Sequence, residues 1–172
     1  MRQHTPTIKL EPKSKLSSDD WRCLGIMVRK LQDQERSWLD EVEEKQQREK
    51  GVCIIGRIQP KMTIKEVKAF FKNNDVLFLA RDPCTNKPIG FCAVERKFDL
   101  GWATCDGLYV EELWRNKKVA TYLMQSALDK TKHDGLDSLD LRVSMKNKAA
   151  QKLYKKLGFS KTAYQMERWV SY

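Results

Sequence analysis

Two short stretches of the chain combine residue types that can bind phosphates and move protons. The first is Leu108–Ala120, where a hydrophobic segment is followed by a short polar loop and a helical pattern. Backbone N–H groups in the first turn of a helix have no helical acceptor, and the helix dipole adds partial positive charge to them. Arg115, Lys117 and Lys118 add full charges. The junction predicts an anion site, although an ordinary basic loop before a helix has the same appearance.

The second stretch is Asn147–Phe159, which combines a helical pattern with a phenol. Asn is a favoured helix N-cap, and Gly158 is typical of the position just after a helix. Tyr154 lies in the last turn of this pattern. Core packing is the ordinary role of such a tyrosine. Between Arg142 and Lys161 the chain has basic residues and no acidic ones, which suits a ligand with several phosphates.

Hydrophobic periodicity predicts the elements that position these stretches. A Thr-x-x-Glu capping box at Thr63–Glu66 and the turn formers of Asp82–Pro88 mark two boundaries. The order of elements indicates a mixed α/β sheet with helices packed on it. Strands are expected at about 7–12, 76–80, 89–94, 102–110 and 139–143, with a final strand or hairpin at 159–170, and helices at about 21–31, 37–50, 63–71, 117–133 and 147–157.

Composition narrows the class of protein. The 172 residues contain no internal repeat and no Pro/Gly/Ser-rich linker, so one domain over residues 1–172 is expected. No apolar run approaches the roughly 20 residues of a membrane-spanning helix, so no membrane partner is expected. Five cysteines without a Cys-x-x-Cys pair, and only two histidines, argue against disulfides and a metal site and favour an intracellular, cytoplasmic protein. Monomer and homodimer remain equally open.

The formal net charge of +10 has three interpretations: nucleic-acid binding, binding of an anionic cofactor, or a solvated lysine-rich surface. The chain has no helix-turn-helix, zinc-finger or RNA-recognition pattern, which disfavours nucleic acid as a partner. A basic nucleic-acid-binding domain is kept as the alternative that rests on charge alone.

Taken together, in this order and roughly 30 residues apart, the two stretches resemble the GNAT N-acetyltransferase superfamily. The first is similar to its coenzyme A motif, Arg/Gln-x-x-Gly-x-Gly/Ala, with Arg115 first and Ala120 last. The second matches the Asn-x-x-Ala-x-x-Leu-Tyr-x-x-x-Gly-Phe signature at every defined position. The resemblance is detailed over Trp102–Phe159, the expected acetyl-CoA-binding core, and is only topological before it. It implies a GNAT-type mixed, mostly antiparallel central sheet flanked by helices.

The resemblance implies acetyl-CoA as co-substrate. Its pyrophosphate would lie on the backbone N–H groups of 116–121, and its pantetheine would pair with the strand edge of 108–110. An N–H near Val110 would polarise the acetyl carbonyl, and Asn147 would bind pantetheine, cap its helix, or do both. The cofactor-binding residues implied are Leu108, Tyr109, Val110, Arg115, Asn116, Lys117, Lys118, Val119, Ala120, Thr121, Asn147 and Tyr154.

The implied reaction is acetyl transfer to a primary amine by direct attack in a ternary complex. Tyr154 matches the general acid of the family. Of the strand positions that often hold the base, Thr104 and Asp106, Asp106 is the better chemical candidate, acting through a water, unless it only supports a bulge. Glu95 and Glu111 are weaker candidates. A covalent route through Cys105 is disfavoured because neighbouring strand residues face opposite ways.

One departure from the motif concerns Lys118, which replaces the central glycine. Glycine allows close approach of the backbone to a phosphate. A lysine can still present its N–H if its φ is helical and its side chain points away. The substitution supports a second hypothesis, a non-catalytic acyl-CoA-binding protein of the same fold.

The amine acceptor stays open between a small molecule and a protein amine. In the family it meets the early helices and the last strands. The residues that this implies here are Trp21, Trp38, Glu41, Glu43, Glu44, Tyr164, Glu167 and Trp169. The acidic residues of 40–44 have a solvated helix face as their simpler explanation.

Overall fold

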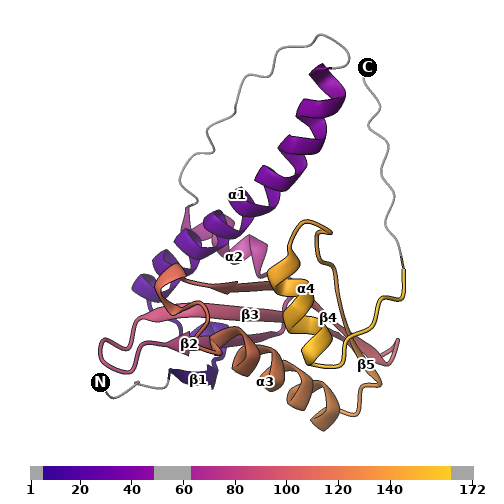
Figure 1. Ribbon diagram of the computed structural model, residues 1–172. Helices are drawn as coiled ribbons and strands as arrows, with labels where there is room; N and C mark the ends of the chain where they lie inside the picture. Colours follow the sequence, from indigo (N-terminus) through magenta and orange to yellow (C-terminus); the bar gives the residue numbers. More distant parts are fainter. Residues whose placement is uncertain (1–5, 49–62, 164–172) are drawn as a thin grey trace.

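The computed structural model describes residues 6–48 and 63–163 (Figure 1). Its centre is a five-stranded sheet in the order β1-β2-β3-β4-β5. The first four strands are antiparallel to their neighbours, and β5 runs parallel to β4. This confirms the expected mixed, mostly antiparallel sheet. The strands are β1 (Thr7–Leu10), β2 (Val76–Arg81), β3 (Pro88–Lys97), β4 (Trp102–Val110) and β5 (Ser138–Leu141).

Helices cover both faces of the sheet (Figure 1). The α1/α2 face carries one buried cluster, in which Trp21, Phe71 and Phe91 pack together. The α3/α4 face carries the other, to which Leu123 and Tyr154 belong. The helices are α1 (Ser18–Arg48), α2 (Ile64–Phe70), α3 (Val119–His133) and α4 (Lys148–Lys156), with short 3₁₀ turns η1 (Lys13–Lys15) and η2 (Glu112–Trp114).

The first helix corrects a prediction. The expected helices at 21–31 and 37–50 form one helix, α1, of 31 residues. Residues 32–36 contain no glycine or proline, so nothing in the backbone interrupts the helix between the two apolar stretches. At 1.5 Å per residue, α1 is roughly 45 Å long, and its C-terminal part rises away from the sheet (Figure 1).

Trp21 also corrects an expectation. Its side chain is only 5% exposed and packs against Phe71 at 6.3 Å between ring centroids. It belongs to the core and is not available to an acceptor. Two predicted boundaries hold: Thr63 and Glu66 form the expected capping box of α2, and the Asn147 side chain caps α4.

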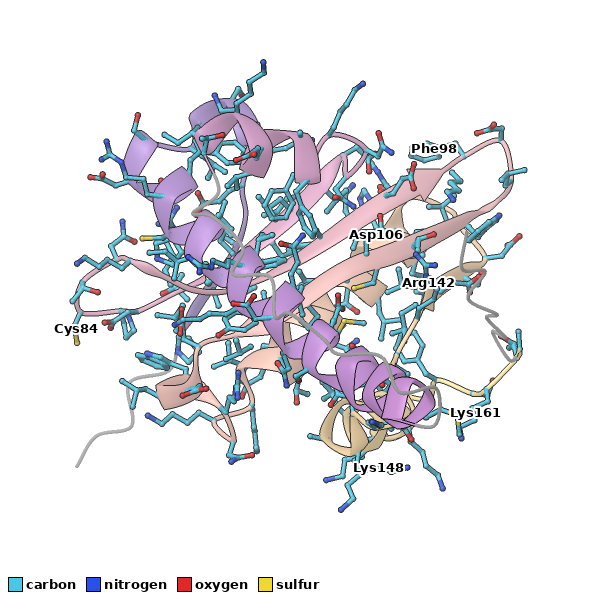
Figure 2. The ribbon with its side chains drawn as sticks, turned by 90° about the horizontal axis from the view of Figure 1, so that it is seen from above. Cys84, Phe98, Asp106, Arg142, Lys148 and Lys161 are labelled. Atoms are coloured by element: carbon cyan, nitrogen blue, oxygen red, sulfur yellow. The ribbon has the colours of Figure 1, made fainter. Side chains whose placement is uncertain are left out.

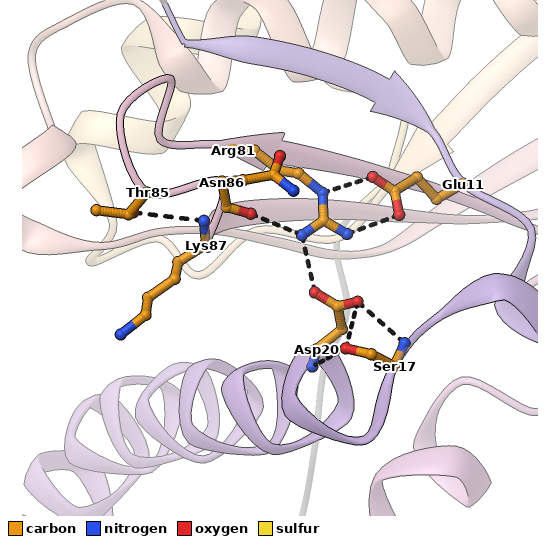
Figure 3. A network of polar contacts seen from close by, with 7 residues as sticks. All are labelled: Glu11, Ser17, Asp20, Arg81, Thr85, Asn86 and Lys87. Carbon is orange, nitrogen blue, oxygen red and sulfur yellow. Dashed lines mark hydrogen bonds and ion pairs between the residues drawn. The ribbon is translucent and has the colours of Figure 1, made fainter.

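A charge cluster at the β1/β2 edge was not foreseen from the sequence. The guanidinium of Arg81 is 7% exposed and donates to both carboxylate oxygens of Glu11 at 2.6 and 2.7 Å. It also donates to Asp20 at 2.8 Å and to the Asn86 carbonyl at 2.9 Å (Figure 3). Asp20 in turn accepts from Ser17 at the start of α1. The cluster ties β1, β2 and α1 together, and every charge in it has a partner.

Several residues predicted near the C-terminus and in the second half of α1 lie outside the described part of the structure. The predicted last strand lies partly outside the described residues, and residues 159–163 form no strand. Of the acceptor-side residues named above, Tyr164, Glu167 and Trp169 lie outside the described residues, and the side chains of Trp38, Glu41, Glu43 and Glu44 are not described either. Within the described ranges, no helix combines the length and apolar character needed to cross a membrane.

Candidate active site

The strand β4 extends beyond the end of its neighbour β5. The parallel register begins at Trp102↔Ser138 and ends at Cys105↔Leu141. Beyond that point β4 continues to Val110 with β3 on one side and, among the described residues, no strand on the other. The sheet therefore opens between β4 and β5, and residues 106–110 present a free backbone edge.

A β-bulge at Asp106 marks the beginning of this free edge. Ala93 pairs with Gly107 and the next residue, Val94, pairs with Cys105, so Asp106 is the extra residue on β4. A bulge turns neighbouring side chains to the same face. Cys105 packs in the α3/α4 cluster, whereas a Cβ on Gly107 would meet Leu31 and Phe91 of the α1/α2 cluster. The sequence raised a bulge as the alternative to a catalytic role for Asp106; the bulge is present and also presents Asp106 to the α1/α2 face.

The carboxylate of Asp106 has one neutral partner. Asn74, buried just after α2, donates an amide hydrogen to it at 2.8 Å. Burial raises the pKa of Asp106 above its ordinary value; the Asn74 hydrogen bond acts in the opposite direction, and the charge of Glu95 adds to the rise. A carboxylate with a raised pKa and no ion pair is suited to accept a proton. The other candidates differ: Glu95 pairs with Lys97 at 3.7 Å, and Glu111 pairs with Lys30 at 2.7 Å.

Backbone groups of Val110 point into the opening. The N–H of Glu111 donates to Ile89 of β3 at 2.9 Å. Because neighbouring residues of an antiparallel strand direct their backbone groups to opposite sides, the N–H and C=O of Val110 face away from β3. The Val110 carbonyl accepts from the Arg115 side chain at 3.2 Å, which agrees with this direction. The Val110 N–H can therefore donate to a ligand placed along the free edge.

Arg115 contacts the end of β4, although its side chain is 42% exposed. Besides its bond to Val110, its guanidinium lies 5.8 Å from the centre of the Tyr109 ring and 3.7 Å from a carboxylate oxygen of Glu112. Sequence reasoning assigned Arg115 to the cofactor. Its observed contacts make it a brace for the strand end, so its removal would disturb β4 as well as any phosphate contact.

The N-terminus of α3 is open. Its N-cap residue, Lys118, provides no side-chain cap, and no described group accepts from the N–H groups of Val119, Ala120 and Thr121. Lys118 has φ +61° and ψ 9°, the left-handed conformation, and Asn116 has φ +61°. The condition under which a lysine is expected to present its N–H, a helical φ, is therefore not met. The backbone takes the conformation that the motif glycine adopts without strain, and the lysine bears the steric cost.

Tyr154 projects from α4 into the α3/α4 cluster. Its side chain is 9% exposed, and its ring lies 5.7 Å from that of Phe159. Burial raises the pKa of Tyr154 well above its ordinary value, and the buried thiols of Cys105 and Cys92 add to the rise. Its hydroxyl has no hydrogen-bond partner among the described residues. A protonated phenol without a partner, beside β4 near its bulge, can donate a proton to a ligand atom in the opening.

The cysteine next to Asp106 faces the other way, as expected. Cys105 is 7% exposed, and its Sγ lies 3.7 Å from that of Cys92 and 3.9 Å from the Met124 sulfur. No histidine or lysine contacts this sulfur cluster in the described residues, so no described base or cation is placed to activate Cys105 as a nucleophile.

Asn147 completes the opening from the α4 side. Its Oδ1 accepts from the N–H of Ala150 at 3.1 Å, which confirms the capping role. Its amide hydrogens have no described partner and remain available to a ligand. Thus the N-cap side chain of α4, Asn147, caps its helix, whereas that of α3, Lys118, does not.

A mixed polar surface lies beside Asp106 on the α1/α2 face. Ala103 and Cys105 face the opposite cluster, so Thr104 between them faces this side; its Oγ1 is sealed from solvent and has no hydrogen-bond partner. Lys97 lies 4.5 Å from the Trp102 ring centre. Arg142 follows β5 (Figure 2). Sequence reasoning did not name Arg142 as a site residue. The only available signal was strand alternation, which places Arg142 on the face opposite to Leu139 and Leu141.

The chain belongs to the GNAT acetyltransferase family. The model of the acetyltransferase (GNAT) family matches residues 31–159, three quarters of the chain. No curated protein sequence matches it.

Solved structures share its fold at low sequence identity. A transcriptional regulator from Bacillus halodurans is 18% identical with a TM-score of 0.63, covering 96% of this chain and 100% of that one. The ribosomal-protein-S18-alanine N-acetyltransferase from Escherichia coli is 16% identical with a TM-score of 0.62, covering 92% and 80%. The NatC complex bound to Gag peptide and CoA contributes a chain 18% identical with a TM-score of 0.61, covering 91% and 86%.

Proposed function

We propose that this protein is an acetyl-CoA-dependent N-acetyltransferase that acetylates a primary amine by direct attack in a ternary complex. The observation that carries the proposal is the free edge of β4 at residues 106–110, which leads to the open N-terminus of α3. An extended ligand can add to a free strand edge through backbone hydrogen bonds, and a helix N-terminus holds phosphate. Acetyl-CoA has these two parts in the same order, pantetheine and then pyrophosphate.

The acetyl carbonyl would accept a hydrogen bond from the Val110 N–H. The amine nitrogen forms its bond to the carbonyl carbon, and the oxygen takes up negative charge. A backbone donor already directed into the opening stabilises that charge without reorganisation. The carbon–sulfur bond then breaks and CoA leaves as its thiolate.

Two proton transfers accompany the attack. A primary ammonium has a pKa of about 10.4 and must lose its proton first. Asp106, with its raised pKa and neutral partner, would accept that proton through a water. Tyr154 stays protonated because burial raises its pKa, and it would give its proton to the leaving sulfur.

Lys118 does not argue for loss of cofactor binding. Its left-handed backbone is the one that the motif glycine permits, so the direction of the following N–H groups is retained. The cost is local strain of roughly 1–2 kcal/mol. A protein that binds acyl-CoA without turnover is therefore an outcome of the test rather than a second proposal.

Calorimetry with acetyl-CoA tests the cofactor site. Lys117→Glu places a negative charge at the exposed start of α3 and should weaken binding at least tenfold. Lys132→Glu makes the same change at the other end of that helix and should leave binding within twofold. No binding by the wild-type protein, or equal weakening by both variants, would contradict the proposed site.

An amine panel then tests turnover. CoA release should be followed by chromatography, because exposed Cys84 would react with thiol reagents. Acetylated amine formed in equal amount to CoA supports the proposed reaction. Tight one-to-one binding without product from any amine would favour the binding-only protein. Salt-sensitive binding to nucleic acid without affinity for CoA would favour the nucleic-acid-binding alternative.

A further inference from the structure

Arg142 differs from the other arginines whose side chains are described. It is exposed just after β5 and forms no hydrogen bond or ion pair among the described residues. The others each pair with at least one carboxylate: Arg22, Arg29, Arg81, Arg96 and Arg115. A guanidinium offers up to five donors in a planar fork, and none of those of Arg142 has an acceptor among the described residues.

Arg142 lies on the same face as Asp106. Leu139 and Leu141 pack toward α3 and α4, so the strand parity sends Asp140 and Arg142 to the other side. The pKa of Asp106 depends most on burial, on the Asn74 bond and on the charges of Glu95 and Lys97. The positive charge of Arg142 also acts on Asp106 and lowers its pKa. Figure 2 shows Asp106 on β4 and Arg142, just after β5, near each other.

These opposite charges are close enough to interact and yet remain unpaired. Asp106 accepts from the neutral amide of Asn74, and neither Asp106 nor Asp140 forms an ion pair with Arg142. The sealed Thr104 hydroxyl, which has no partner among the described residues, lies two residues before Asp106 on β4, opposite Glu95 on β3 and Asp140 on β5. A negative group, a positive group and an unsatisfied hydroxyl on one face match a ligand that carries both charges.

We propose that the acceptor is a small amine that also bears a carboxylate or phosphate group, bound by Arg142 while its nitrogen lies at Asp106. Acetylation of the acceptor nitrogen rests on the proposed function, whereas binding of the anionic group by Arg142 does not. A guanidinium recognises either oxyanion through two parallel hydrogen bonds. Uncharged and purely cationic side groups on the acceptor would give Arg142 no hydrogen-bond acceptor, although its charge also acts on the carboxylates of Glu35 and Asp106.

Matched pairs of amines test this assignment. 4-Aminobutyrate is compared with 4-aminobutanamide, and O-phosphoethanolamine with ethanolamine, so that each pair differs in its anionic group. Binding to the CoA-loaded full-length protein is measured by ligand-observed NMR at one ionic strength, because salt screens such contacts. Turnover with acetyl-CoA is measured in parallel. The variants are Arg142→Gln and, as an exposed arginine at the opposite end of the sheet, Arg22→Gln.

The expected result is at least tenfold tighter binding of the anionic member in one pair or both, with a matching preference in kcat/KM. The pair of amines that shows this preference identifies whether the site binds a carboxylate or a phosphate group. Arg142→Gln should remove the preference by raising KM, leave kcat within threefold and leave the neutral amines unchanged, while Arg22→Gln changes nothing.

Three results would overturn the assignment: equal binding of charged and neutral members, equal losses for both members in Arg142→Gln, or acetylation of a peptide N-terminus with no response to any small amine. The binding measurement needs no turnover. Selective, Arg142-dependent binding without acetylation would therefore refute the proposed function and leave the anion site standing.

Discussion

The two ends of the central sheet differ in whether their charged groups are paired. At the β1/β2 edge, Arg81 is almost fully buried and bonds to Glu11, Asp20 and a backbone carbonyl (Figure 3). Around the β4/β5 opening, Arg142 and the Tyr154 hydroxyl have no described partner, and Asp106 has only a neutral one. Each end contains an arginine and an aspartate, so the difference lies in how these groups are paired.

The difference separates groups that stabilise the fold from groups available to a ligand. A buried charge without partners is costly, so the Arg81 cluster persists because its bonds are complete. Polar groups without described partners and the left-handed Lys118 lower stability, and such features cluster at ligand sites in proteins. Mutations at the first end should therefore alter unfolding, and those at the second should alter binding or turnover.

The largest expected effect is on stability, in Arg81→Met. The change leaves the Glu11 and Asp20 carboxylates together without a cation, and the free energy of unfolding should fall by about 3 kcal/mol. Arg22→Met removes only an exposed pair with Asp19 and should cost less than about 1 kcal/mol. Urea unfolding measures both. Similar small losses would erase the proposed contrast between the two ends.

Tyr154→Phe should have the opposite profile. Loss of the acid should lower kcat about a hundredfold, equivalent to about 2.7 kcal/mol in the barrier. The unfolding free energy should change little, because the hydroxyl has no described partner and the ring is kept. Steady-state kinetics and urea unfolding of the same preparation decide the matter. Lower stability with unchanged kcat would make Tyr154 a core residue only.

Asp106→Asn should reduce kcat/KM about tenfold at neutral pH. As a base, Asp106 works when deprotonated, so the wild-type rate should rise as pH passes its raised pKa, and the variant should lose this limb. The exposed Asp99→Asn serves as the control and should keep it. An unchanged pH profile in Asp106→Asn would leave Asp106 as the bulge residue alone.

The same raised pKa predicts the sign of a stability effect. The folded protein holds the Asp106 proton to a higher pH than the unfolded chain does, so ionisation costs stability as pH rises through that interval. Above it, Asp106→Asn should be slightly more stable than wild type. A clear loss of stability there would mean that the charged carboxylate supports the fold.

The smallest expected effect is in Lys118→Gly. Glycine adopts φ +61° without the steric cost, so unfolding should require about 1 kcal/mol more. The acetyl-CoA affinity should stay the same or rise up to threefold. Lys117 is not among the positive-φ residues, and Lys117→Gly should instead destabilise slightly. Equal responses of both variants would show that the left-handed backbone carries no strain.

Local patterns predicted much of the fold. The bounds of β4, the capping box at Thr63 and the Asn147 cap follow from residue types within a few positions of one another. The continuous helix α1 was missed because its middle lacks an apolar face, and apolar spacing was the signal used to detect helices. No signal in the sequence indicated the left-handed backbone of Lys118, because the preference of lysine for a right-handed helix is overridden by the loop it must close.

The sequence by itself determined the family through two motifs, and with it the order of strands and helices. The end of β5 pairing at Leu141, the facing of Asp106 and Arg142, the brace made by Arg115 and the completed Arg81 cluster were decided only by tertiary structure. Apart from the contacts of Arg115 and the Arg81–Asn86 bond, these features join residues 36 to 70 positions apart, and no local pattern encodes such contacts. Burial and partner distance, which separate a structural charge from a functional one, exist only once the chain is folded.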